Sequence, residues 1–161
     1  MSQLMYDATA AAGYERYEIS NFARPGRRCR HNLDCWRLGE YRGFGAGAHS
    51  FLRAPAPLRL ANTPDTEEYV RRIAAGGDAV ATREEPPPRQ FAGEALMLAL
   101  RTADGVDETD FAQTHGAAPG DLFPEAAALG EAQGWIESVG GRLRLTENGI
   151  LFSNELFRLL F

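Results

Sequence analysis

Three consecutive prolines, Pro86–Pro88, constrain this chain of 161 residues more than any other feature of its sequence. Proline has no backbone N–H to donate, and it biases the preceding residue toward extended conformations. Such a run interrupts both helices and central strands, although Pro88 suits the first turn of a following helix. We therefore expect two domains, spanning residues 1–85 and 86–161.

The second domain has mainly helical periodicity. Apolar residues from Phe91 to Ala99 form one face at helical spacing, and Asp107 is placed to cap a helix that ends near Gly116. The Gly140-Gly141 pair permits the positive φ angles of a two-residue hairpin. The expected order is helices over 88–101, 107–116 and 121–134, a hairpin over 135–145, and a helix over 150–161. This is the order of a small, helical, winged-helix-like domain.

The first domain has the pattern of a piece of α/β structure. Residues 14–22 are rich in strand formers and follow an Ala-rich stretch that ends at Gly13, which is typical of a helix leading into a strand of a parallel sheet. A single strand leaves both edges unpaired, so we expect strands supplied by another region, or self-association through the open edge. A capped helix is expected between Thr63 and the Gly76-Gly77 stop. The fold class expected for the whole chain is α+β.

Cysteine content and hydropathy bear on location. The two cysteines are too few for a disulfide scaffold, which indicates a reduced, cytoplasmic protein. No apolar run approaches the roughly 18 residues of a membrane-spanning helix. Residues 1–7 lack the basic and apolar regions of an export signal. The sequence therefore predicts neither a membrane span nor secretion.

Charge is segregated along the chain. Residues 1–60 contain nine Arg and five acidic residues, whereas residues 61–161 contain eight Arg and seventeen acidic residues, and there is no Lys. The helix expected over 121–133, at the recognition position of a winged helix, has three acidic residues and no basic one. A polyanion would repel such a helix, so we expect no nucleic acid partner.

The densest cluster of chemically active residues is Cys29–Trp36. It contains both cysteines, one of three histidines and a tryptophan. Five arginines lie within or beside it: Arg24, Arg27, Arg28, Arg30 and Arg37. Imidazole is a good axial ligand of haem iron, an aromatic side chain can stack on a flat macrocycle, and guanidinium groups pair with its propionates.

Other interpretations of this cluster are simpler. A surface loop with a hydrogen-bonded histidine and two inert thiols accounts for the spacing alone. The Cys-x-His-x3-Cys pattern fits the usual zinc sites poorly, and a disulfide is not expected in a reduced compartment.

A second segment of interest is Gly43–Ser50, in which small residues alternate and His49 lies near the end. Small residues let a ligand or another backbone approach closely. The glycine offsets do not match the dinucleotide-binding fingerprint. A tight strand or turn explains the segment equally well, with His49 in a structural role.

Together these segments resemble one family. They are similar to the oxygen-independent coproporphyrinogen III oxidase-like radical S-adenosylmethionine proteins, and most similar to their HemW branch, the haem chaperones. In the first domain the resemblance lies in Tyr17–Gly26, Cys29–Asn32 with Trp36, and Gly43–Ser50. In the second it lies in Leu100-Arg101 with Gly105–Asp107, and in Arg144–Thr146 with Gly149, which resemble the C-terminal domain of HemN.

The resemblance implies a particular organisation. Family members have a partial α/β barrel that holds a 4Fe–4S cluster and S-adenosylmethionine, followed by a small helical domain. This chain would supply the last strand of the barrel, the loops after it and the C-terminal domain. The cluster motif, Cys-x3-Cys-x2-Cys, has no match here. Cluster and S-adenosylmethionine are therefore expected only in a full-length parent, and this chain alone is not expected to be a complete enzyme.

The resemblance also implies a haem site. The HemW branch carries His-Asn-x-x-Tyr-Trp, and here His31, Asn32 and Trp36 match while Cys35 replaces the tyrosine. His31 would be the axial ligand of the iron, and Trp36 would cover the ring.

Further contacts are expected around the ring. Arg24, Arg27, Arg28 or Arg30 would pair with the propionates of the haem, with Arg24 and Arg30 as the leading candidates. In the wider family the glycine strip lies near the adenosine-bearing cofactor, which implies contacts from Gly45, Gly47 and His49 in a full-length context.

We therefore expect haem binding and delivery to a haem-accepting protein, with the barrel region of a longer parent as the other partner. Two alternatives remain. The parent could be an oxygen-independent coproporphyrinogen III oxidase of porphyrin biosynthesis. The chain could also be a cofactor-free module whose acidic half docks a protein partner.

Overall fold

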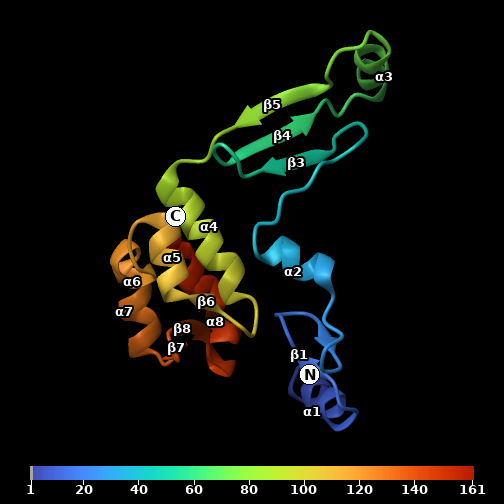
Figure 1. Ribbon diagram of the computed structural model, residues 1–161. Helices are drawn as coiled ribbons and strands as arrows, with labels where there is room; N and C mark the ends of the chain where they lie inside the picture. Colours follow the sequence, from blue (N-terminus) through green and yellow to red (C-terminus); the bar gives the residue numbers. More distant parts are fainter. Residues whose placement is uncertain (1) are drawn as a thin grey trace. The chain divides into compact units, whose positions relative to one another are not determined.

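The structure is a computed structural model that describes residues 2–161. It forms two compact units (Figure 1). The first contains the described residues up to Leu38 together with Ala92–Phe161, and the second is Gly39–Phe91. Helices and strands are both present, which confirms the α+β class. The division into domains 1–85 and 86–161 stays a prediction, as does the winged-helix-like character of the second.

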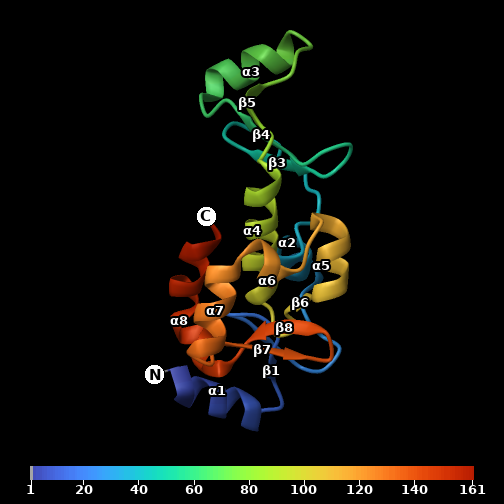
Figure 2. The ribbon, with the colours of Figure 1, turned by 90° about the vertical axis from the view of Figure 1, so that its left-hand side faces the viewer.

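The C-terminal part of the first unit packs helices around a small sheet. It begins within α4 (Pro88–Leu100). The elements that follow are β6 (Val106–Asp107), α5 (Glu108–His115), α6 (Pro119–Leu122), α7 (Pro124–Ala132), β7 (Ile136–Val139), β8 (Arg142–Leu145), α8 (Glu147–Phe157) and the 3₁₀ turn η1 (Arg158–Leu160). The hairpin β7–β8 lies beside α7 and α8 (Figure 2). Phe123, Leu156 and Leu160 are almost fully buried in the core, where each contributes about 1.5–3 kcal/mol of transfer free energy.

Local signals account for most of these boundaries. The Asp107 side chain accepts hydrogen bonds from the backbone N–H groups of Thr109 and Asp110, and Gly116 ends α5 at φ 89°. Gly140 and Gly141 both have positive φ, as the predicted hairpin requires. These three predictions are confirmed.

Two features of this region differ from expectation. The helix predicted from Asp121 is divided into α6 and α7, because Pro124 biases Phe123 away from helical backbone, to φ −130° and ψ 61°. The hairpin also gains a third strand, since β6 pairs with β8 in the order β6-β8-β7. Two residues are too few to give a periodic signal, so sequence reasoning missed β6.

The N-terminal part of the first unit differs most from expectation. After α1 (Ser2–Ala11), residues 14–22 form no continuous parallel strand; β1 (Glu15–Arg16) and β2 (Phe22–Ala23) pair antiparallel instead. The chain turns between them because the Glu18 carboxylate accepts from the backbone N–H of Ser20 at 3.1 Å, while the Tyr17 N–H donates to the Asn21 carbonyl. The expectation of a lone barrel strand with two open edges is therefore wrong for this structure.

This segment also pairs with the loop that follows α4. Glu18 and Thr102 form an antiparallel bridge. The Ile19 N–H donates to the Arg101 carbonyl, and the Ala103 N–H donates to the Tyr17 carbonyl. The N-terminal segment and the C-terminal helices are joined within one unit by these bonds. Self-association through an open edge stays a prediction.

The second unit is an antiparallel sheet with one helix. Its strands β3 (His49–Leu52), β4 (Leu58–Asn62) and β5 (Val80–Glu84) pair in sequence order (Figure 1). The helix α3 (Thr66–Ala74) begins with Asp65, whose side chain accepts from the Glu68 N–H, which confirms the helix predicted before Gly76-Gly77. Phe51 and Phe91 are buried, with ring centroids 6.1 Å apart.

The described residues contain no helix that combines the length and the apolar character needed to cross a membrane.

Candidate functional site

The candidate site is centred on the short helix α2 (Arg30–Trp36) of the first unit. Cys29 precedes it at the N-cap position, and Arg37 follows it. The His31 side chain is exposed, and its Nε2 lies 3.9 Å from Sγ of Cys35, one turn further along the helix. Both cysteines are free thiols and exposed. The imidazole predicted as an iron ligand is thus open to solvent and not enclosed by packed side chains.

Asn32 faces the body of the unit. Its Nδ2 donates to the Tyr17 hydroxyl at 3.4 Å, and Tyr17 is almost fully buried. Its Oδ1 accepts from Sγ of Cys29 at 3.5 Å. Asn32 therefore anchors α2 to the β1–β2 segment. Asn32 therefore has a positioning role: it fixes the helix that carries the exposed His31.

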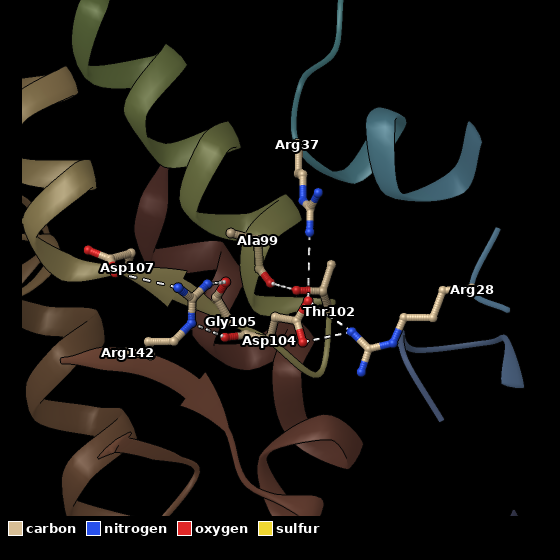
Figure 3. Close-up of polar contacts among 8 residues, drawn as sticks. All are labelled: Arg28, Arg37, Ala99, Thr102, Asp104, Gly105, Asp107 and Arg142. Carbon is tan, nitrogen blue, oxygen red and sulfur yellow. Dashed lines mark hydrogen bonds and ion pairs between the residues drawn. The ribbon is translucent and has the colours of Figure 1, made fainter. Parts of the chain in front are cut away.

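Two of the five arginines are held by one carboxylate (Figure 3). Arg28 Nη1 donates to both oxygens of Asp104, at 2.8 and 3.0 Å, and Arg37 Nη2 lies 3.7 Å from Oδ2 of the same residue. Because Arg28 precedes α2 and Arg37 follows it, this arrangement holds the helix at both ends. We call it the Asp104 clamp. Arg28 is engaged by this carboxylate through two short hydrogen bonds, whereas Arg37, which is 64% exposed, makes only the longer contact.

The loop that carries Asp104 is itself fixed. Thr102 Oγ1 donates to the Ala99 carbonyl at the end of α4. Arg142 of β8 donates from Nε to the Asp104 carbonyl at 2.8 Å and from Nη2 to the Gly105 carbonyl at 3.2 Å, and its Nη1 contacts Asp107 (Figure 3). The clamp is thereby connected to the β7–β8 hairpin.

Of the four arginines predicted to pair with propionates, Arg28 is instead bound to Asp104, whereas Arg24, Arg27 and Arg30 are exposed. The Arg24 guanidinium lies 5.2 Å from the centre of the Tyr14 ring. Among residues 2–161, none of these three exposed arginines forms an ion pair. They remain available to an anionic ligand.

Trp36 is partly buried. The guanidinium carbon of Arg101 lies 5.9 Å from the centre of its ring and 5.3 Å from the ring of Phe157, a buried residue of α8. The electron-rich face of an aromatic ring attracts a cation, so the Arg101 guanidinium helps to hold the Trp36 ring in place. The predicted role of Trp36 as a cover for a macrocycle is limited to the part of the ring that Arg101 leaves accessible.

A small polar cavity of about 30 Å³ lies where the β1–β2 segment meets the loop after α4, lined in part by Glu18, Arg101 and Thr102. Glu18 Oε1 and Arg101 Nε are buried there, and neither has a hydrogen-bond partner in the structure. A cavity of this size and polarity holds one or two water molecules, which would satisfy both groups. It is far too small for a tetrapyrrole.

The glycine strip belongs to the second unit, whereas His31 belongs to the first. Gly45 and Gly47 have positive φ angles, and their N–H groups donate to the Tyr69 hydroxyl and the Thr63 carbonyl. Internal bonds therefore account for these glycines. His49 is exposed and is the first residue of β3.

The donor chemistry of α2 fits haem. An exposed imidazole, a thiol beside it and three exposed arginines without ion pairs among the described residues supply an iron ligand and partners for carboxylates. Within residues 2–161, no three His, Cys, Asp or Glu side chains are gathered as a metal site, so the structure has no preformed zinc centre there. Sequence reasoning missed Tyr17, Asp104 and Arg101 as supporting residues, because their contacts join segments far apart in the chain.

Known proteins of similar sequence support the family resemblance that the motifs indicated. Residues 87–152 match the family model described as the HemN C-terminal domain. The chain is 32% identical to "Heme chaperone HemW" of Bacillus subtilis (strain 168), over 98% of this chain and 41% of that protein. It is 34% identical to "Heme chaperone HemW" of Escherichia coli (strain K12), over 92% of this chain and 38% of that protein. The chain spans about two fifths of the length of these curated relatives.

One solved structure is also similar. It is the coproporphyrinogen III oxidase (HemN) from Escherichia coli, described as a radical SAM enzyme, with a TM-score of 0.73. The match covers 99% of this chain and 39% of that chain at 15% identity. At that identity the likeness concerns the fold alone.

Proposed function

Because this chain belongs to the HemN/HemW radical SAM family and corresponds to its C-terminal portion, we propose that it binds haem on the exposed side of α2 and passes it to a haem-accepting protein. The observation that carries this proposal is the exposed imidazole of His31, in a helix held at both ends by the Asp104 clamp.

Each residue has a definite part in this proposal. Haem, when bound, would supply two propionates and an iron that accepts a protein ligand. His31 offers a ring nitrogen to the iron, while Arg24 and Arg30 offer guanidinium groups to the carboxylates. Because both arginines are exposed, each such ion pair contributes only about 0.2–1 kcal/mol. The imidazole therefore supplies most of the specificity.

Exposure suits delivery more than storage. A cofactor enclosed in a core is released only when the core opens, which takes part of the unfolding free energy. A cofactor held on an exposed helix can be reached directly by a second protein. The reduced, cytoplasmic setting expected from the two free thiols is part of this proposal.

The 4Fe–4S cluster and S-adenosylmethionine are proposed only for a longer parent. In that context Gly45, Gly47 and His49 would lie near the adenosine-bearing cofactor. The strip's N–H groups at Gly45 and Gly47 are engaged within the unit, so the exposed His49 side chain is the better candidate for such a contact.

The test is a titration of the purified chain with dithionite-reduced haem, followed by the Soret band. His31→Ala should weaken binding by about tenfold or more, because loss of a metal ligand costs at least ~1.4 kcal/mol. His49→Ala, an equally exposed histidine in the other unit, is the matched control and should leave the titration unchanged. An unaltered spectrum and affinity in His31→Ala would remove His31 from the proposal.

An origin in the oxidase itself is the second candidate. It would place this chain in a parent that oxidatively decarboxylates coproporphyrinogen III, and the fold likeness to HemN is compatible with it. The retained His-Asn-x-x-x-Trp pattern and the curated relatives favour the chaperone branch.

A third candidate, docking of a protein by the acidic half without a cofactor, predicts no Soret change at any haem concentration.

A further inference from the structure

The side chains of His31 and Cys35 occupy the same side of α2. They are four residues apart, which places them on successive turns of the helix, and their Nε2 and Sγ atoms are 3.9 Å apart. Both side chains are exposed. Bonds from a first-row metal to imidazole nitrogen and to thiolate sulfur are roughly 2.0–2.3 Å long, so an iron atom that reaches one of these atoms is within a small rotamer change of the other.

Haem restricts how the two groups can be used. Four positions around its iron are taken by the macrocycle, which leaves one axial position on each face. His31 and Cys35 cannot take opposite faces, because the macrocycle would then have to pass between two turns of one helix. They must therefore compete for a single axial position.

The oxidation state of the iron decides that competition. Thiolate is an anion and imidazole is neutral, so thiolate is favoured more by the higher charge of ferric iron. We propose that α2 is a two-ligand haem site in which the Cys35 thiolate binds ferric iron and the His31 imidazole binds ferrous iron. The inference rests on the proposed function, since it requires that haem binds at α2.

The change between the two states balances in electrons and protons. With haem bound, one electron from a reductant (dithionite in the experiment below) would weaken the hold of the anionic Cys35 sulfur on the iron, and the released thiolate would take a proton from solvent. The neighbouring His31 imidazole would then hold the iron in its place. The consequence for delivery is that the oxidation state of the haem iron determines which side chain, Cys35 or His31, an acceptor protein must displace.

The chain offers a matched control for this proposal. Cys29 is also a free, exposed thiol, but it lies at the N-cap and its Sγ contacts Asn32, with no recorded contact to His31. Cys29→Ser removes a thiol of the same kind without removing the proposed ligand.

The experiment compares ferric haemin and dithionite-reduced haem bound to the 161-residue chain, by optical absorption and, for the ferric form, electron paramagnetic resonance. The wild-type ferric complex should show thiolate ligation, and Cys35→Ser should convert it to an imidazole-ligated spectrum. Cys35→Ser should leave the ferrous affinity within about twofold. His31→Ala should keep the ferric thiolate spectrum and lose about tenfold in ferrous affinity. Cys29→Ser should behave as wild type in both states.

The outcomes separate the two proposals. If Cys35→Ser has the wild-type ferric spectrum while His31→Ala still loses ferrous binding, the two-ligand inference is refuted and the proposed function stands. If the double variant His31→Ala/Cys35→Ser binds haem in both states as wild type does, haem does not bind at α2 and both are refuted.

Discussion

Removal of the Asp104 carboxylate should loosen α2 and lower the stability of the first unit. Asp104→Asn keeps the shape of the side chain and one acceptor oxygen, but it removes the charge that Arg28 and Arg37 share. The side chains of Arg28 and Asp104 are 36% and 35% exposed, so water screens the pair in part. We assign this pair about 1 kcal/mol, between the values for exposed and for well-buried charge-assisted bonds. Arg37, at 3.7 Å and 64% exposed, adds only a few tenths, or ~0.3 kcal/mol.

Urea unfolding gives the first measurement. Asp104→Asn should lower the free energy of unfolding by about 1 kcal/mol in dilute buffer. In about 1 M NaCl, where the Debye length falls to ~3 Å, the loss should be smaller than in dilute buffer, because both side chains of the pair are partly exposed. A double-mutant cycle with Arg28→Met should give a coupling free energy of about 1 kcal/mol.

Amide hydrogen exchange gives the second measurement. Opening of α2 should become about fivefold more frequent, since 1 kcal/mol changes a population by that factor. Asp34→Asn is the control, because Asp34 is an exposed acidic residue of α2 that forms no ion pair among the described residues. If Asp104→Asn and Asp34→Asn change stability and exchange equally, the clamp does not hold α2, and the reasoning is wrong.

Two further predictions concern the C-terminal helices. Asp107→Ala leaves two N–H groups at the start of α5 without their acceptor and weakens the contact to Arg142. Thermal unfolding should therefore show a free energy of unfolding lower by about 1–2 kcal/mol, and Asp107→Asn should largely avoid this loss. Gly149→Ala should lower the free energy of unfolding further, by about 2–4 kcal/mol in the same assay, because a methyl group there would overlap the backbone carbonyl of Trp135. An unchanged melting temperature would contradict this and show that α8 can shift away from that carbonyl.

Elements with short-range signals could be predicted from the sequence. The cap at Asp107, the stop at Gly116 and the Gly140-Gly141 turn each depend on residues within a few positions, and the structure has all three. The helix α3 was predictable for the same reason, through Asp65 and the glycines after Ala74. The triple proline correctly marked the start of α4 at Pro88.

Features that depend on distant partners could not be predicted. Residues 14–22 have the composition of a strand, but the buried Glu18 bonds to Ser20 and turns the chain, and its pairing partner is Thr102. The sheet of the second unit was missed because β3 and β4 are short and flank a proline-containing loop. For the site, sequence similarity pointed to His31, but only the structure shows that Arg28 is committed to Asp104 while Arg30 is free of ion pairs.

The segregation of charge along the sequence has a structural consequence for the site. Parts of the arginine-rich half (residues 1–60) and of the acidic half (residues 61–161) meet within the first unit, where Arg28 and Arg37 pair with Asp104 across 76 and 67 residues of chain. Asp104 of the acidic half thus pairs with the two arginines that flank α2, while Arg24, Arg27 and Arg30 form no ion pair among the described residues. If all the arginines were free, they would attract any polyanion without discrimination. Pairing two of the five arginines of this segment internally leaves three exposed positive groups, Arg24, Arg27 and Arg30, from which the two carboxylates at the edge of a haem could be paired.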